Sequence, residues 1–270
     1  MKSLLKTLFI VSVLFNIAIA DIGFPKSYYK LPLTEQKEYF FNYFNERIEI
    51  ENRKILRERA FVKSLNKNKK LDPASKEYRR LKDLQIKYKI QDIYNYSRYL
   101  ERVDIIPPSM ALAQAATESG WGKSRFFKKA NNIFGHWTYN PAIGMMPLRR
   151  PSGKKHFIRI FPNLQASITA YMRNLNRTGA YYEFRLKRKH MRTTNTFING
   201  MKLSETMSKY SGIGHNYIKI LKSIIRKNHL TDYDKKFFNK IKNEKNKKNT
   251  ELIKKKEENG IYSTLKNLFT

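Results

Sequence analysis

Apolar side chains recur every three or four residues from Glu35 to about Leu100, a stretch that has no glycine and only Pro73 as a helix breaker. This spacing places the apolar side chains on one face of an α-helix. The stretch therefore predicts two long helices, the second of which begins with Asp72 as its cap and Pro73 in its first turn. We expect a helical N-terminal extension whose apolar face serves packing.

The composition changes between Ile105 and Leu230, where glycine and proline return and both tryptophans lie. A helix rich in alanine is expected from Met110 to Glu118, and Ser119-Gly120 ends it. A turn-rich segment follows, and then a predicted β-hairpin formed by 145–148 and 156–161. Further helices are expected at about 163–176, 178–188 and 214–228, and the Lys-rich residues after 234 are expected to form a frayed helix or to be disordered.

The first twenty residues have the pattern of an export signal. Lys2 and Lys6 precede an apolar run from Leu8 to Ile19, and small residues at 18 and 20 suit cleavage before Asp21. The run is short for a membrane span, although an uncleaved N-terminal anchor is the alternative. We expect the chain to be exported to the periplasm or cell envelope, with no integral membrane span after the signal is removed.

The charge of the chain is strongly positive and uneven. Lys and Arg number 55 against 22 Asp and Glu, a formal net charge of +33. Residues 105–230 hold 22 of the basic residues but only three acids: Glu118, Glu183 and Glu205. Such a field attracts polyanions, so nucleic acid, anionic lipid and acidic cell-wall polymer are candidates. The export signal argues against nucleic acid.

Glu118 is the acid with the most suggestive position. At the C-terminal end of an apolar helix, the carbonyl dipoles and partial burial both raise a carboxyl pKa, whereas the surrounding positive charge lowers it. A carboxyl group that keeps its proton can serve as a general acid. The alternative is a glutamate that merely ends a helix.

No metal or cofactor is expected. The chain has no cysteine, and its five histidines are scattered without an H-E-x-x-H motif or paired acidic ligands. Phosphate-binding and dinucleotide-binding glycine motifs are also absent. Structural or surface roles are therefore expected for His136, His156, His190, His215 and His229.

Several ordered motifs resemble those of one family. The sequence reads A-Q-A-A-T-E-S-G-W-G at 113–122, N-N-I-F-G at 131–135, M-P-L at 146–148, A-Y-M-R-N-L-N at 170–176 and Y-S-G-I-G-H-N-Y at 210–217. Their order and separations resemble the Bax-like branch of the bacterial peptidoglycan endo-β-N-acetylglucosaminidases. The likeness spans roughly 100–234, about half of the chain.

This resemblance implies an α+β, predominantly helical fold, with a lysozyme-like catalytic domain and a small β-hairpin lobe. The implied organisation is a signal peptide at 1–20, the helical N-terminal extension at 21–100, the catalytic domain at 101–234 and a Lys-rich flexible or helical tail at 235–270. The implied activity is that of an exported glycoside hydrolase that cleaves the glycan strand of peptidoglycan after N-acetylglucosamine. Because every motif lies between 105 and 230, we expect the chemistry not to need the extension or the tail.

The resemblance also assigns roles to individual residues. Glu118 becomes the general acid, and Tyr217, slightly favoured over Tyr210, bonds the sugar's acetamido group or orients water. Substrate-binding positions are implied for Asn132, Phe134, Trp137 and Trp121. For these four the alternatives are a turn asparagine and core aromatic residues.

The chain departs from many relatives outside the Bax-like branch because it has no acid from Ser119 through Tyr182. Glu118 is therefore expected to be the only catalytic carboxyl group, since Glu183 and Glu205 lie on no recognised motif. Water or the substrate's 2-acetamido oxygen would then meet the oxocarbenium-like centre. The alternatives are a lytic transglycosylase on the same fold, a non-catalytic cell-wall-binding protein, and a nucleic-acid or membrane binder.

Overall fold

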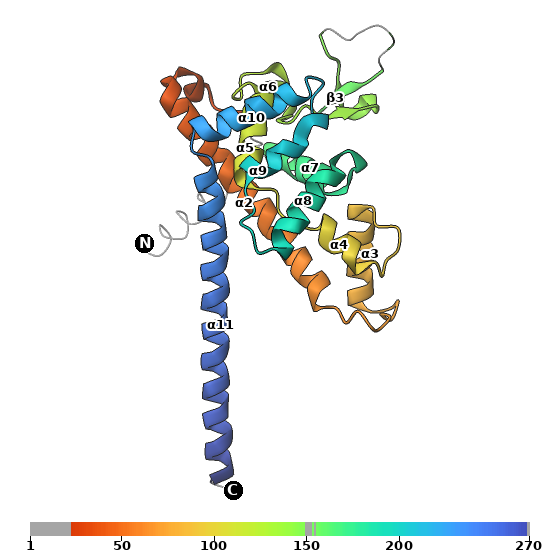
Figure 1. Cartoon of the computed structure of the whole chain (residues 1–270), viewed down its shortest axis with the longest axis vertical. Coiled ribbons are helices and arrows are strands. Elements are labelled where there is room, and N and C mark those ends of the chain that lie inside the picture. Colours follow the sequence, from red (N-terminus) through yellow and green to blue (C-terminus); the bar gives the residue numbers. More distant parts are fainter. Residues whose placement is uncertain (1–22, 149–152, 154, 269–270) are drawn as a thin grey trace, which may run out of the picture.

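The structure, a computed structural model, describes residues 23–148, 153 and 155–268. The predicted export signal and residues 151–152 of the predicted hairpin loop lie outside these residues. Figure 1 shows a helical body with a small sheet at one corner and a long C-terminal helix that projects away from it. None of the helices in the described part of the chain is both long and apolar enough to cross a membrane.

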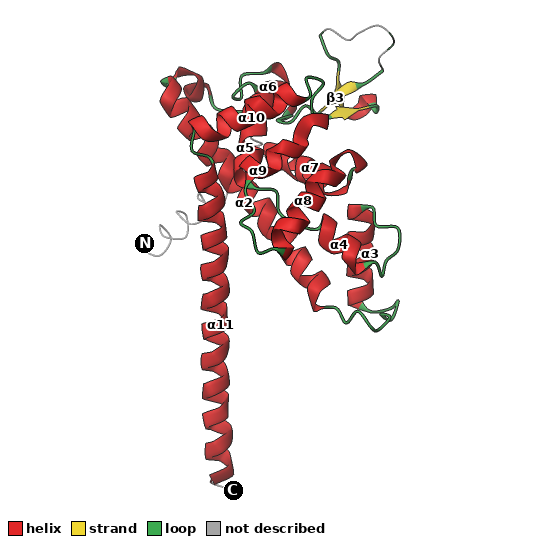
Figure 2. Ribbon diagram, viewed as in Figure 1, coloured by secondary structure: helices red, strands yellow, loops and turns green. Residues whose placement is uncertain are grey.

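Helices form most of the body, and strands are confined to one corner (Figure 2). The α-helices are α2 (Leu33–Ser64), α3 (Lys76–Tyr88), α4 (Tyr96–Arg102), α5 (Pro108–Ser119), α6 (Arg125–Ala130), α7 (Leu164–Arg177), α8 (Tyr182–Thr193), α9 (Gly200–Leu203), α10 (His215–Lys227) and α11 (Thr231–Leu268). Short 3-10 helices are η1 (Lys26–Lys30), η2 (Pro141–Ile143), η3 (Gly179–Tyr181) and η4 (Ser204–Lys209). The predicted α+β, predominantly helical fold with a small β-lobe is confirmed.

The sheet has three short antiparallel strands in the order β1-β3-β2. These are β1 (Trp137–Thr138), β2 (Gly144–Met145) and β3 (Phe157–Arg159). Met145 and Trp137 both pair with Ile158, from opposite sides. The predicted hairpin is therefore present as β2 and β3, with shorter strands than expected. No sequence pattern indicated β1, because two residues cannot establish an alternation.

The second helix predicted in the extension is divided into α3 and α4. Lys89 ends α3 in the left-handed conformation, with φ 54°, and the Asn95 side chain accepts a hydrogen bond from the Arg98 amide to begin α4. The cap of α3 is Ser75, whose hydroxyl accepts from the Tyr78 amide, whereas Asp72 only closes the preceding turn. Local side-chain hydrogen bonds therefore fix where these helices begin, although the apolar spacing continues from one helix to the next.

Helix α2 shares one hydrophobic core with the part of the chain that carries the motifs. Phe40 and Phe44 are fully buried, and the ring of Phe40 lies 5.4 Å from that of Trp121. Ahead of α2, the hydroxyls of Tyr28 and Tyr29 donate to the carbonyls of Trp121 and Gly122, respectively. The extension therefore packs against the segment that directly follows α5.

Helix α5 lies at the centre of the body, in contact with α2, α9, α10 and α11. Its alanines are buried and allow these neighbours to approach closely. A Cβ atom on Gly200 would lie 2.2 Å from the Ser109 hydroxyl, so only glycine fits there. Asp234 of α11 accepts hydrogen bonds from the amide and hydroxyl of Ser109 and from the Gly200 amide, which joins three helices at the N-terminus of α5.

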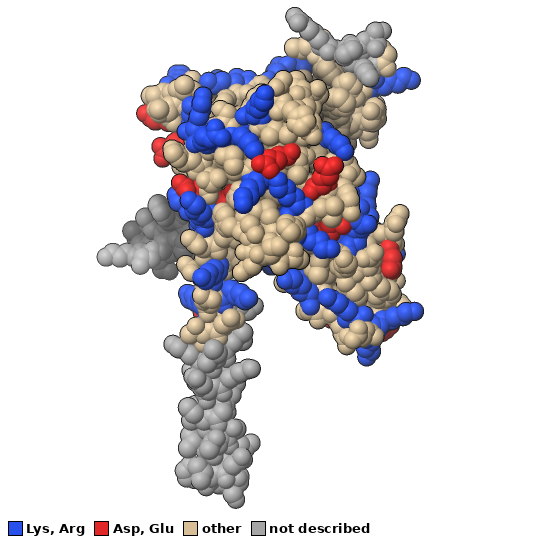
Figure 3. All heavy atoms as spheres, in the orientation of Figure 1, with Lys and Arg blue, Asp and Glu red and all other residues tan. Residues whose placement is uncertain are grey.

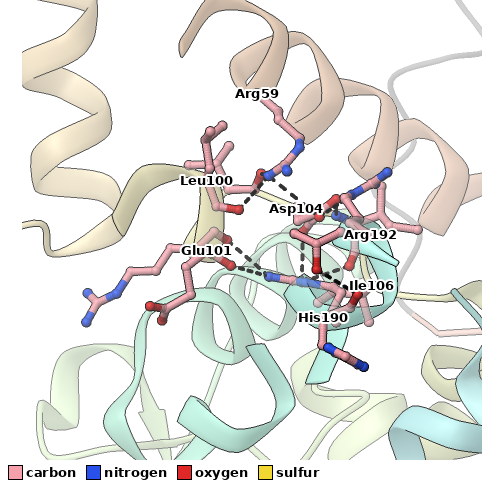
Figure 4. Close-up of polar contacts among 12 residues, drawn as sticks. Arg59, Leu100, Glu101, Asp104, Ile106, His190 and Arg192 are labelled. Carbon is pink, nitrogen blue, oxygen red and sulfur yellow. Dashed lines mark hydrogen bonds and ion pairs between the residues drawn. The ribbon is translucent and has the colours of Figure 1, made fainter. Parts of the chain in front are cut away.

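The end of α4 and the connection to α5, residues 100–107 and here named the entry loop, are held by arginines (Figure 4). Arg188 is fully buried and donates to the carbonyls of Glu101, Asp104 and Ile105. Arg59 of α2 donates to two further carbonyls of the loop, and Arg192 pairs with the Asp104 carboxylate. The loop that leads into α5 is thereby fixed from α2 and α8 together.

Candidate active site

Glu118 lies in the last turn of α5, where Gly120 takes the left-handed conformation, with φ 56°, that ends the helix. Its side chain is partly buried and borders a cleft of about 670 Å³ between α7, the sheet and the turn after η4. The residues that line this cleft are Glu118, Phe126, Phe134, Gly135, His136, Trp137, Ile158, Arg159, Ala170, Arg173, Asn174, Arg177, Tyr181, Tyr210, Ser211 and Gly212.

A chain of hydrogen bonds runs from the core to this carboxyl group. The Tyr171 hydroxyl donates to Gln114 Oε1 at 2.7 Å, and Gln114 Nε2 donates to the Tyr217 hydroxyl at 3.2 Å. The Tyr217 hydroxyl then donates to Glu118 Oε1 at 2.7 Å. Because Gln114, Tyr171 and Tyr217 are all buried, one rotamer of each is fixed, and together they fix the orientation of the carboxyl group.

Burial raises the pKa of Glu118 above its ordinary value, and the hydrogen bond from Tyr217 lowers it to a smaller extent. The direction that the sequence left open is therefore upward, and the effect that opposes burial is the Tyr217 hydrogen bond rather than the surrounding positive charge. A carboxyl group with a raised pKa holds a proton that it can transfer to a leaving oxygen.

The second oxygen of Glu118 lies beside Gly135. A Cβ atom on Gly135 would lie 3.7 Å from Glu118 Oε2, and the φ of this glycine is +70°. Glycine accepts this conformation without strain, so the turn can pass close to the carboxyl group. Among the described residues no donor bonds to Oε2, which leaves this oxygen for a ligand.

Tyr210 and Phe134 form the wall beside this hydrogen-bond chain. The Tyr210 ring stacks on that of Tyr217 with a centroid separation of 5.6 Å, and its hydroxyl donates to the Phe134 carbonyl at 3.2 Å. Phe134 in turn stacks on Tyr171 at 3.8 Å. Both residues line the cleft, but Tyr217 and not Tyr210 contacts the carboxyl group.

Trp137 also lines the cleft. It is 62% exposed, and one face of its ring system stacks on the ring of His156 at 4.1 Å. An exposed, supported aromatic face is suited to stacking on a sugar ring.

The structure does not bring Asn132 and Trp121 to the cleft. Asn132 is buried and bonds to the amide and carbonyl of His136 and to the Arg159 carbonyl, which makes it a turn residue that connects to the sheet. Trp121 packs against Phe40 and Phe41 of α2. Both positions correspond to the structural alternatives considered for them.

Five residues of the site had no assigned role in the sequence. Gln114 and Tyr171 lie within the motifs, but a sequence does not reveal that they bond to each other. Arg173 and Arg177 follow Ala170 at helical spacing, which could have placed them on one face of α7. Arg159 reaches the same cleft from β3, a meeting that only the tertiary fold determines.

The remaining acids of this region lie elsewhere, on a surface where basic side chains predominate over acidic ones on the face drawn in Figure 3. Glu205 forms ion pairs with Lys187 and Lys222 on the surface, and Glu183 is exposed near Lys209. Glu118 is thus the only carboxyl group among the residues that line the cleft. Within the described parts of the chain, no three His, Cys, Asp or Glu side chains cluster as metal ligands would.

Comparison with known proteins gives a consistent result. The family model named glucosaminidase, described as mannosyl-glycoprotein endo-β-N-acetylglucosaminidase, matches residues 93–230. Protein bax of Escherichia coli (strain K12) is 32% identical over 200 residues, which cover 72% of this chain and 70% of that protein. No solved structure matches the chain. The resemblance noted in the sequence is confirmed.

Proposed function

Because the chain belongs to the glucosaminidase family of glycoside hydrolases, we propose that it is an exported endo-β-N-acetylglucosaminidase. Its substrate in this proposal is the glycan strand of peptidoglycan, cleaved after N-acetylglucosamine, and Glu118 is the general acid. The observation that carries the proposal is the Glu118 carboxyl group, which has a raised pKa and borders a cleft lined by aromatic and basic side chains.

In the proposed reaction, Glu118 protonates the oxygen of the glycosidic bond as that bond breaks. The accessible oxygen Oε2 is the proton donor, because Oε1 already accepts a hydrogen bond from Tyr217. As the proton leaves, Glu118 becomes a carboxylate, and the hydrogen bond from Tyr217 strengthens. Tyr217 thus stabilises the transition state more than the ground state, which is the condition for catalysis.

The second half of the reaction proceeds without a second carboxylate from the cleft. The carbon from which the leaving oxygen departs acquires positive charge, and either water or the substrate's 2-acetamido oxygen attacks it. The Tyr210 hydroxyl already donates to the Phe134 carbonyl and is less free to assist. Burial raises the pKa of Tyr181 and Tyr210, which line the cleft, so both phenols stay neutral beside the carboxylate that Glu118 becomes.

Export forms part of the proposal. Peptidoglycan lies outside the cytoplasm, and the first twenty residues have the charge and apolar pattern of an export signal. The intact mass of the protein recovered from the cell envelope tests this: we expect a chain that begins at Asp21, and a full-length chain in the cytoplasm would contradict it.

The test of the chemistry is the Glu118→Gln variant. Glutamine keeps the size and most hydrogen bonds but has no transferable proton, so hydrolysis of purified sacculi should fall by roughly 10²–10⁴-fold. Glu183→Gln is the matched control, because its side chain is 72% exposed and lies outside the cleft. A rate near that of the unmodified protein for Glu118→Gln would refute the enzymatic role.

The products identify the reaction. A new reducing end at N-acetylglucosamine is expected for the proposed hydrolysis. An anhydro ring would instead indicate a lytic transglycosylase, and binding without any product would indicate a cell-wall-binding protein.

A further inference from the structure

Three arginines of the cleft have no assigned role in this chemistry. Arg173 and Arg177 lie one turn apart on α7, and Arg159 comes from the end of β3. All three line the cleft that Glu118 borders, together with Asn174. A helix and a strand thus bring three guanidinium groups to one wall of the cleft.

Nothing in the described parts of the chain neutralises these groups. No carboxylate of the described residues lies within ion-pair distance of any of the three, and Glu118 is the only acid among the residues that line the cleft. Burial and the positive charges of Arg173 and Arg159 lower the pKa of Arg177. The pKa of nearby His136 is lowered to about 4, so this residue adds no charge at neutral pH.

Elsewhere the protein provides acceptors for the arginines that it buries. Arg185 bonds to the carboxylate of Glu101, and Arg188 bonds to backbone carbonyls of the entry loop. Like charges one helical turn apart, as at Arg173 and Arg177, destabilise a helix. An unpaired cluster of this kind costs stability, and an anionic ligand would offset that cost.

Two of the arginines lie between the cleft and a second hollow, where a substituent of a bound glycan could extend out of the cleft. Arg159, Ala170 and Arg173 line a second hollow of about 480 Å³ on the other side, whose floor includes Phe161 and Thr169. The Arg159 guanidinium lies over the Phe161 ring at 4.7 Å, which restrains it at the boundary between the two hollows. A glycan in the cleft could therefore extend a substituent past these groups.

We propose that Arg159, Arg173 and Arg177 form a carboxylate-binding subsite, which recognises the acidic substituent of a sugar bound beside Glu118. This proposal rests on the proposed function. The acidic substituent is the group by which the site would distinguish its substrate from a neutral polymer of N-acetylglucosamine. A planar guanidinium can donate two parallel hydrogen bonds to a carboxylate, which gives both affinity and orientation. The carboxylate belongs either to the lactyl group of N-acetylmuramic acid or to the peptide attached to it.

The test is calorimetric binding to the full-length chain carrying Glu118→Gln, so that turnover does not consume the ligand. Three tetrasaccharides are compared. They are neutral chitotetraose, a peptide-free tetramer that alternates N-acetylglucosamine and N-acetylmuramic acid, and the same tetramer with its peptides. The test variant combines Arg159→Gln, Arg173→Gln and Arg177→Gln. The control combines Lys76→Gln, Arg79→Gln and Lys82→Gln, three exposed positions of α3 that remove the same charge.

Loss of the subsite should weaken binding of an acid-bearing tetramer by roughly 10–100-fold, as expected for hydrogen bonds to a charged group. The affinity for chitotetraose should change by less than about threefold, and the control variant should resemble its parent. If the peptide-free tetramer shows the loss, the lactyl carboxylate is the ligand; if only the peptide-bearing tetramer does, the peptide carboxylates are. The single variant Arg173→Gln provides the same comparison should the triple variant fail to melt cooperatively.

Three results would overturn the subsite. They are a parent protein without preference for acid-bearing over neutral tetramers, equal losses for both classes of ligand, and an equal loss in the α3 control. If Glu118→Gln leaves turnover intact while the arginine variants lose selectivity, the proposed chemistry fails but the subsite stands. The reverse pattern leaves the chemistry in place and removes the subsite.

Discussion

Replacement of Tyr217 by phenylalanine isolates the effect of one hydrogen bond on catalysis. The variant keeps the buried ring and its stacking on Tyr210 but loses the donor 2.7 Å from Glu118 Oε1. A hydrogen bond to a charged group contributes about 1.5–3 kcal/mol, and one to a neutral group about 1 kcal/mol. The difference, about 0.5–2 kcal/mol, should lower kcat by about 2–30-fold with little change in KM.

The same variant should change the pH profile in a defined direction. Glu118 acts in its protonated form, so activity falls as the pH rises through its pKa. The Tyr217 hydrogen bond lowers that pKa. Its removal should therefore raise the pKa, and the upper limb of the profile of kcat/KM should move to higher pH. The measurement is release of soluble glycan from sacculi across the pH range.

Tyr210→Phe provides the matched control. It also removes one buried phenol hydroxyl from the tyrosine pair, but its hydrogen bond goes to the Phe134 carbonyl rather than to Glu118. We expect a smaller loss in kcat and no displacement of the upper limb. If the two variants behave alike, or if the limb of Tyr217→Phe stays in place, the role given to the Tyr217 hydrogen bond is refuted. Tyr217→Phe also leaves the Gln114 amide without its hydrogen-bond acceptor, which should lower the free energy of unfolding by about 1–3 kcal/mol. A urea melt of each variant measures this loss of stability separately from the loss of activity.

Two further predictions concern stability. A fragment of residues 92–234, which holds every motif, should show no cooperative melt by circular dichroism. The reason is that it lacks the α2 residues that cover Trp121 and hold the entry loop. A cooperative melt of this fragment would show that the core folds without the extension. Burial lowers the pKa of His136 to about 4 in the folded state, against 6.5 for a free side chain. Between these pH values the unfolded state binds a proton that the folded state does not, so stability is lost as the pH falls from 6.5 to 4. His136→Phe should reduce that loss by roughly 2–3 kcal/mol in denaturant melts at pH 7 and pH 4, and an unchanged pH dependence would contradict it.

The sequence was sufficient to predict those parts of the site that depend on local sequence patterns. Glu118 follows a helix of small residues and precedes Ser-Gly, so its position at a helix end could be predicted. The Tyr217 motif identified Tyr217 as a residue of the site, although as a contact of the sugar or of water and not of Glu118. The helices expected at about 163–176 and 214–228 match α7 and α10 to within a residue, and the apolar pattern that begins at Glu35 starts two residues after α2 does.

Tertiary contacts determined what the sequence left open. Trp121 belongs to the same motif as Glu118, but it turns to the other side of the helix end and packs on α2. The buried arginines of α8 have the local pattern of an exposed basic helix, and only the carbonyls of the entry loop explain their burial. The extension could not be recognised as part of the core, because apolar spacing reveals a buried face but not its partner.

The anchoring of α5 has a consequence for the order of folding. The start of this helix is fixed by Asn52 through Ile106, by Arg188 through the entry loop, and by Asp234 through Ser109, which lies 125 positions earlier in the chain. Contacts between such distant positions close large loops and form slowly. During synthesis, Glu118 emerges from the ribosome long before Asp234, the residue that completes the anchor of its helix. We therefore expect hydrolytic competence to arise late, once the chain has been released through Asp234, so that an unfinished molecule is inert.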